Sequence, residues 1–174
     1  MEEVTFLSHK ARKELYKYSF VTIIAVITWI LQVSIFSNFH ILDANPNVIL
    51  LGSIFFGLIF GPIAGAFYGI ISSFFIASIL YDHTFYLSFP IIGFTSGLIT
   101  KNFFADELLF YLILCILFTL PMELFNGLQY SQIYEVDIFN RLYLISIAEM
   151  MLNAIIVPFY YFILNTLSKY LDFR

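Results

Sequence analysis

Long apolar runs separated by short polar stretches dominate this chain. Four runs stand out, at about residues 18–37, 48–81, 86–128 and 142–167. About 20 apolar residues in a helix are enough to cross a bilayer core about 30 Å thick. Two of the four runs are much longer than that, so each of them must contain a break.

Both long runs do contain a break. Residues 48–81 would form a rod about 50 Å long as one helix, but Gly61-Pro62 lies near their middle, and proline removes a backbone donor and disfavours helix in the residue before it. The polar segment 100–107 interrupts the other long run. The pattern therefore predicts an all-α integral membrane protein with six transmembrane helices, at about residues 18–37, 47–60, 62–81, 86–100, 107–128 and 142–167.

Small residues recur at every fourth position around the first break. Steps of four residues turn about 400°, so such a row drifts by about 40° per step and cannot stay on one face of a straight helix. We therefore expect a tight hairpin with its corner at Gly61-Pro62, whose two arms use small residues for close packing or for contact with a partner. With the next glycine pair, the candidate contact residues are Gly57, Gly61, Pro62, Gly65, Gly69, Gly93 and Gly97.

Composition leaves no material for a separate soluble module. The chain has 174 residues, of which 61% are hydrophobic and 11% charged, with a mean hydropathy of +0.91, whereas soluble domains carry about 25% charged residues. We expect one polytopic membrane domain over residues 1–174, with 1–17 as a cytoplasmic N-terminal segment. The first apolar run is too long for a signal-peptide core and has no Ala-x-Ala site after it. A net charge of −4 gives no indication of nucleic-acid binding.

The positions of the basic residues test the number of spans. With six spans and a cytoplasmic N-terminus, only Arg141 lies outside. The residues placed inside are Lys10, Arg12, Lys13, Lys17, Lys101, Lys169 and Arg174. Were 48–81 a single span, the split would change from seven against one to five against three, so the positive-inside rule favours six spans with both termini in the cytoplasm.

Two of the expected helices, 47–60 and 86–100, are short. They reach only about 21–23 Å, so they require a thinned bilayer or shielding by neighbouring helices. A re-entrant pair would preserve the same loop charges and is the alternative.

Polar side chains recur at similar depth in the half of the bundle predicted to face outward. A carboxylate in a membrane is costly and should face the bundle or a water-filled cavity, and Glu123 and Glu149 lie on consecutive antiparallel helices where they can meet. The predicted polar layer comprises Gln32, Asp82, Glu123, Asn126, Glu149 and Asn153. It is interpreted as interhelical hydrogen bonding, with a partner-binding site, a solute-binding site and a proton relay as alternatives.

No residue pattern indicates catalysis. The histidines lie outside the predicted spans, so Ser72-Ser73 has no membrane histidine to activate it. His40 and His83 lie in two separate loops without the close spacing of a metal site, and Cys115 is the only cysteine. Phosphate-binding loops and metalloprotease motifs are absent from the sequence. We expect no enzyme activity, no metal and no cofactor.

Taken in order, several short motifs resemble the bacterial rod shape-determining protein family MreD. They are Leu31-Gln32, Asn45-Pro46-Asn47-Val-Ile-Leu-Leu51, Gly61-Pro-Ile-Ala-Gly65-Ala-Phe-Tyr-Gly69 followed by Asp82, Gly93-Phe-Thr-Ser-Gly97, and Glu149-Met-Met-Leu-Asn153-Ala with Pro158. The resemblance spans about residues 20–168. It departs from the family at Asn45, where a basic residue is usual, and at Ser73, where many members have glycine, which leaves any family role of these positions open.

The resemblance implies a non-enzymatic scaffold of the cell-elongation complex in the bacterial cytoplasmic (inner) membrane. Such a protein binds an MreC-like single-pass partner, and through it MreB-like filaments and the enzymes of lateral peptidoglycan synthesis. The resemblance also implies a fold similar to that of the S components of energy-coupling factor transporters. A small-solute-binding S-component-like subunit is therefore the alternative function, but such subunits usually carry Ala-x-x-x-Ala on the first helix, and the predicted first span has only Ala25.

Overall fold

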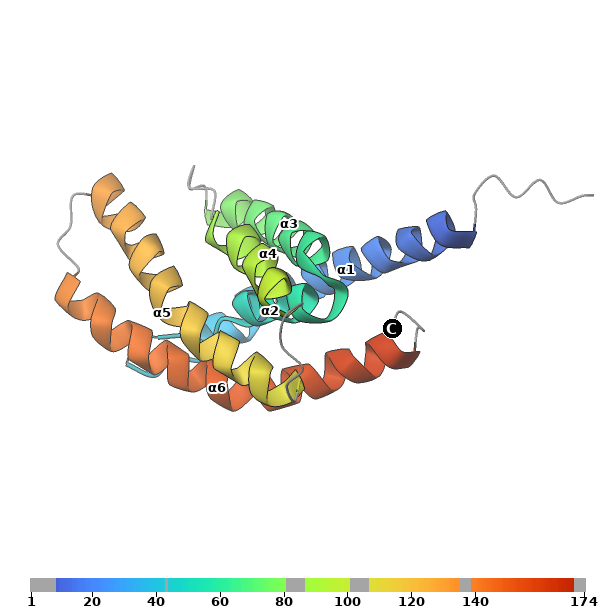
Figure 1. Cartoon of the computed structure of the whole chain (residues 1–174). Helices are drawn as coiled ribbons and strands as arrows, with labels where there is room; N and C mark the ends of the chain where they lie inside the picture. Colours follow the sequence, from blue (N-terminus) through green and yellow to red (C-terminus); the bar gives the residue numbers. More distant parts are fainter. Residues whose placement is uncertain (1–8, 43, 81–86, 101–106, 135–138, 171–174) are drawn as a thin grey trace, which may run out of the picture.

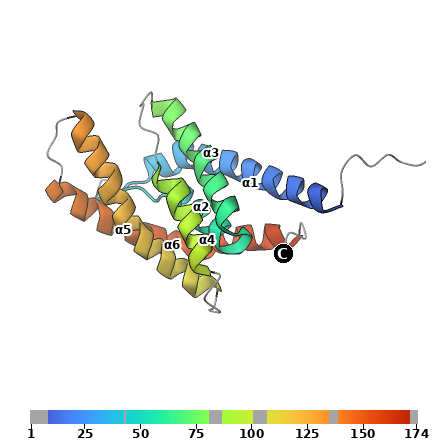
Figure 2. The same ribbon diagram turned by 45° about the horizontal axis from the view of Figure 1, so that its top comes forward.

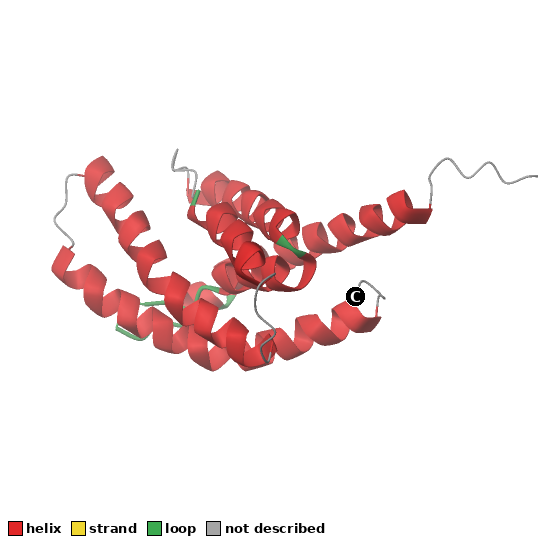
Figure 3. Ribbon diagram, viewed as in Figure 1, coloured by secondary structure: helices red, strands yellow, loops and turns green. Residues whose placement is uncertain are grey.

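The structure is a computed structural model that describes residues 9–42, 44–80, 87–100, 107–134 and 139–170. Within these ranges the chain forms six α-helices and one short 3-10 helix but no β-strand (Figure 3). The helices are α1 (His9–Ser34), α2 (Val48–Phe60), α3 (Pro62–Leu80), α4 (Ser88–Thr100), α5 (Glu107–Tyr134) and α6 (Phe139–Tyr170), with η1 (Phe36–Asn38) after α1.

Three stretches are long and apolar enough to cross a membrane, Ala11–Asn38, Leu108–Phe125 and Tyr143–Tyr170. Three shorter apolar helices lie between the first and the second of them. The all-helical fold expected from the sequence is thus confirmed over the described residues, and the three long apolar stretches support a membrane protein. The number of spans and the orientation stay predictions.

Three helices extend beyond the predicted spans. α1 begins at His9 rather than at residue 18, α5 runs to Tyr134 rather than to 128, and α6 covers Phe139–Tyr170 rather than 142–167. Residues 9–17, expected to belong to the cytoplasmic N-terminal segment 1–17, are thus helical and continuous with the first helix, while their location stays a prediction. Hydropathy marks where apolar residues end, but lysine, arginine and glutamate are good helix formers and let a helix continue beyond that point.

The short helix α2 lies at the centre of the molecule. Its first eleven residues, Val48 to Leu58, are all buried. α1, α3, α4, α5 and α6 all contact it, and Figures 1 and 2 show it behind or between the other helices. A helix that is apolar all round is enclosed either by protein or by lipid. The surrounding helices enclose α2 over its length of about 20 Å.

The remaining helices form two groups around α2, with α1, α3 and α4 in one and α5 and α6 in the other. α3 and α4 lie side by side, and α5 and α6 form a second pair, whereas α4 and α5 contact each other only sparsely (Figure 2). Pro121 and Pro158 lie inside α5 and α6, and α6 appears as a bowed helix in Figure 1. One apolar cluster draws residues from all six helices.

Candidate functional site

The start of α2 is held by an amide from α1. Gln32 Nε2 donates to the carbonyl oxygen of Pro46 at 3.0 Å, and its Oε1 accepts from the backbone N–H of Val48 at 2.9 Å. Asn47 is the N-cap residue of α2, and its Oδ1 accepts from the N–H of Leu50 at 3.0 Å. The first backbone N–H groups of a helix lack partners within the helix, so these two side chains satisfy groups that would otherwise be unpaired.

A second amide reaches the same segment from α6. Asn153 Oδ1 accepts from the backbone N–H of Asn47 at 2.7 Å. Its Nδ2 donates to Thr119 Oγ1 of α5 at 3.2 Å and makes a longer contact with Glu149 Oε1 at 3.5 Å. Thr119 Oγ1 itself donates to the carbonyl oxygen of Cys115 at 2.7 Å. Asn153 is fully buried, so this network joins α2, α5 and α6 in the interior.

The two membrane carboxyls meet at the α5–α6 interface. The carboxyl groups of Glu123 and Glu149 lie close enough to interact, and Glu149 also lies near the side chains of Asn47 and Asn153. A hydrogen bond between two carboxyl groups requires a proton on at least one of them. We call Gln32, Asn47, Thr119, Glu123, Glu149 and Asn153 the α2-start network.

The glycines bring the backbones of α2, α3 and α4 into contact. A Cβ added to Gly65 of α3 would lie 2.6 Å from Gly57 Cα and 2.7 Å from Gly57 N. It would also meet the carbonyl oxygen of Gly93 in α4, and a Cβ on Gly57 would meet that same oxygen. These three glycines therefore mark one point at which three helices touch through their backbones.

The other candidate glycines extend this contact along α3 and α4. A Cβ on Gly97 would lie 2.6 Å from Pro62 Cα, and one on Gly69 would lie 2.5 Å from Pro90 N. Gly61 differs from the others because a Cβ there meets nothing within 4 Å, but its φ of 93° lies in the left-handed region that favours glycine. It forms the corner between α2 and α3. Apart from Gly61, these glycines are occupied by contacts within the chain.

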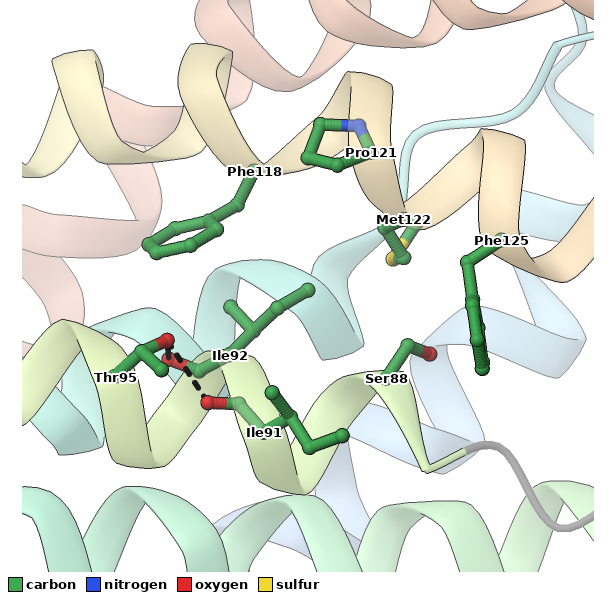
Figure 4. A pocket seen from close by; sticks show the side chains of 8 residues that line it. All are labelled: Ser88, Ile91, Ile92, Thr95, Phe118, Pro121, Met122 and Phe125. Atoms are coloured by element: carbon green, nitrogen blue, oxygen red, sulfur yellow. Dashed lines mark hydrogen bonds between the residues drawn. The ribbon is translucent and has the colours of Figure 1, made fainter.

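A groove of about 270 Å³ lies between α4 and α5, which contact each other only sparsely. Figure 4 shows its two walls, and the residues that line it are Ser88, Ile91, Ile92, Thr95, Phe118, Pro121, Met122 and Phe125. The hydroxyl of Thr95 donates to the carbonyl oxygens of Ile91 and Ile92 in its own helix, at 2.8 and 3.1 Å. The groove is therefore apolar, with no charged side chain in its lining.

The structure brings together four of the six residues of the predicted polar layer, namely Gln32, Glu123, Glu149 and Asn153. Gln32 and Asn153 bond the backbone at the start of α2, and Glu149 interacts with Glu123 and Asn153. Asp82 lies outside the described residues, and Asn126 lies in α5 with a side chain outside the described part of the molecule.

The α2-start network contains two members that were not among the candidates, Asn47 and Thr119. Asn47 precedes an apolar run, which is the usual place of an N-cap residue, and Thr119 shares a helix face with Glu123 by its spacing of four residues. Both signals were present in the sequence. Gly52, which packs against the side chain of Tyr68, was also not among the candidates, because it lies outside the four-residue spacing of the other glycines.

Chemically, this arrangement joins helices by hydrogen bonds. Its donors and acceptors are directed at the backbone of residues 46–48 and at each other. The described residues contain no group of three or more histidine, cysteine or acidic side chains placed to hold a metal ion.

Comparisons of the chain with protein-family models, curated proteins and solved structures found no match. The resemblance to MreD therefore rests on the order of short motifs alone and stays a prediction.

Proposed function

We propose that this protein is a non-enzymatic membrane scaffold of the MreD type, which binds an MreC-like single-pass protein and helps to direct lateral wall synthesis. Its place would be the bacterial cytoplasmic membrane, with MreB-like filaments and peptidoglycan enzymes as indirect partners. The observation that carries the proposal is that the polar side chains of the α2-start network form hydrogen bonds within the protein. Its amides bind the protein's own backbone at Pro46, Asn47 and Val48.

This use of the network bears on the choice between scaffold and solute carrier. A solute-binding pocket needs convergent polar groups that are available to the ligand. Here the amides of Gln32 and Asn153 are engaged within the chain, and the groove between α4 and α5 is apolar. Both features favour a protein that contacts apolar helices over one that binds a small polar solute.

The first experiment depletes the protein in a rod-shaped bacterial host that encodes it. We expect the cells to become round, and the tagged protein to co-purify with a single-pass membrane protein. Cells that keep their rod shape and a preparation without such a partner would contradict the scaffold.

The second experiment identifies the contact face by photo-crosslinking from introduced benzoylphenylalanine. Phe125 at the rim of the α4–α5 groove and Phe162 on α6 are 43% and 72% exposed, so they sample two different faces with the same native residue. A specific partner should crosslink from one of these faces and not equally from both. Equal crosslinking to many membrane proteins from both positions would indicate contact without a defined partner.

An S-component-like subunit is the second candidate, and the pairing of half-buried Glu123 with buried Glu149 is the observation that favours it. If the pair serves a polar ligand, a small solute should remain bound through purification and be lost in Glu149→Leu. Mass spectrometry of the denatured protein measures this directly.

A further inference from the structure

A second group of polar side chains lies around the middle of α2, apart from the α2-start network. The hydroxyl oxygens of Thr28 in α1 and Tyr160 in α6 are hydrogen-bonded at 3.1 Å. Tyr68 and Ser72 lie one turn apart on α3, and both are fully buried. The hydroxyls of Thr28, Ser72 and Tyr160 are all close enough to interact with Tyr68 Oη. We call these four residues the hydroxyl cluster.

The position of Tyr68 is set by its packing on α2. Its ring stacks on Phe56 with centroids 4.9 Å apart. Its outer edge presses on Gly52, where an added Cβ would meet the hydroxyl and lie 2.7 Å from Cε1. Because α2 has no side chain at Gly52, the Tyr68 hydroxyl can reach the middle of the bundle.

Two of the four hydroxyls lack a hydrogen bond of normal geometry. Tyr68 Oη and Ser72 Oγ have no such partner among the described residues. Another buried tyrosine shows the usual arrangement, since Tyr111 Oη donates to the carbonyl oxygen of Leu51 at 2.8 Å. Buried polar side chains are nearly always hydrogen-bonded to protein or to ordered water. Tyr68 Oη and Ser72 Oγ lie near other hydroxyls without a direct bond to any of them, so a shared partner would satisfy both.

We propose that the hydroxyl cluster binds one ordered water molecule, which bridges Tyr68 and Ser72 to the Thr28–Tyr160 pair. A buried water typically makes about three hydrogen bonds and needs two to four polar partners. The cluster offers four hydroxyls, each of which can donate or accept. The bridge joins α3 to α1 and α6 at membrane depth, and it does not depend on the proposed function.

Hydroxyl-radical labelling by X-ray pulses in water enriched in heavy oxygen tests the site in the full-length protein. Radicals form at bound water and label the side chains that touch it, and mass spectrometry locates the label. Tyr111 is the matched control because it is as fully buried as Tyr68 but bonds directly to the backbone. We expect label at Tyr68 and none at Tyr111, and a severalfold loss of the Tyr68 label in Ser72→Ala.

Either of two labelling results overturns the proposal. If Tyr68 stays as unlabelled as Tyr111, its hydroxyl contacts no water. If the two tyrosines are labelled equally, water enters the whole interior and the cluster is not a specific site.

Thermal unfolding of Tyr68→Phe is an independent test, because the midpoint of unfolding should shift in opposite directions for a water-bridged and for an unpaired Tyr68 hydroxyl. Loss of a water-bridged hydroxyl lowers the midpoint of unfolding, whereas loss of an unpaired hydroxyl raises it, because the cost of burying that group disappears. Tyr111→Phe is the control and should lower the midpoint through loss of its direct bond to Leu51. A higher midpoint for Tyr68→Phe than for the wild type overturns the bridge.

Discussion

Asn153 is the residue on which most hydrogen bonds of the α2-start network converge. It accepts from the backbone of Asn47 and donates to Thr119, so one buried side chain serves two other helices. Hydrogen bonds between membrane helices are worth about 0.6 kcal/mol on average, with a maximum near 1.7. A residue that makes two of them, one of which satisfies the backbone N–H of Asn47, should lie in the upper part of that range.

We therefore predict that Asn153→Ala lowers the free energy of unfolding by about 1–2 kcal/mol. Unfolding in mixed micelles of mild and denaturing detergent measures the change. Asn38→Ala is the matched control, since Asn38 also bonds a backbone group, its Nδ2 donating to the carbonyl oxygen of Ser34 at 3.0 Å, but at an exposed position. An equal loss of unfolding free energy in the two variants would show that the network stabilises the protein no more than an exposed hydrogen bond does.

Glu149 tests whether the network needs a charge or only hydrogen bonds. Glu149→Gln keeps a group that can donate to Glu123 and accept from Asn153, so we expect stability within about 0.5 kcal/mol of the wild type. Glu149→Leu leaves Glu123 and Asn153 without this partner and should lose about 1–3 kcal/mol. The same micelle experiment measures both variants, and a Gln variant as unstable as the Leu variant would indicate that a carboxylate is required.

At the scale of elements, the hairpin of α2 and α3 uses glycine for two different reasons. Gly61 needs the freedom of a positive φ at an open corner, whereas Gly65 needs the absence of a Cβ at a backbone contact. Pro62 follows as the first residue of α3, where its missing N–H costs nothing. The hairpin thus depends on conformation at its corner and on close packing along its arm.

Two alanine substitutions separate these reasons. Gly65→Ala pushes a methyl group into the backbone of Gly57 and should cost about 1–3 kcal/mol or more, with loosened packing of α4. Gly61→Ala meets no atom but must adopt an unfavourable φ, at a cost of about 1–2 kcal/mol and without change in helix packing. Unfolding experiments measure the cost, and crosslinking between cysteines introduced on α3 and α4 in a Cys115→Ala background reports the packing. Identical crosslinking in the two variants would contradict this distinction.

Prediction from sequence succeeded where the signal is local and failed where it depends on pairing. The break at Gly61-Pro62 follows from residues next to it, and equal depth on adjacent antiparallel helices was enough to predict that Glu123 and Glu149 meet. The partner of Asn153 lies 106 positions away at Asn47, and nothing in a spacing shows which distant segment a polar side chain will reach. Glycine spacing likewise predicted contact faces, but not that α4 supplies their partner.

At the scale of the whole molecule, the charge pattern predicts six spans with both termini in the cytoplasm. Thiol labelling in intact cells tests this orientation. Single cysteines introduced in a Cys115→Ala background, at residue 104 and at residue 137, can be tested with a membrane-impermeant thiol reagent in intact cells. We expect labelling at 137 and none at 104. The opposite pattern would reverse the orientation, and labelling at both would contradict the six-span count.

The burial of α2 on all sides over Val48 to Leu58 has a consequence for how the chain tolerates mutation. α5 and α6 each have an exposed apolar side, where any apolar residue should be accepted, so a scan of all substitutions should show tolerance that rises and falls with each turn. α2 has no such side over Val48 to Leu58. Its tolerance should therefore be low at every position without helical periodicity, and this stretch should accumulate changes more slowly than any equally hydrophobic segment of the protein.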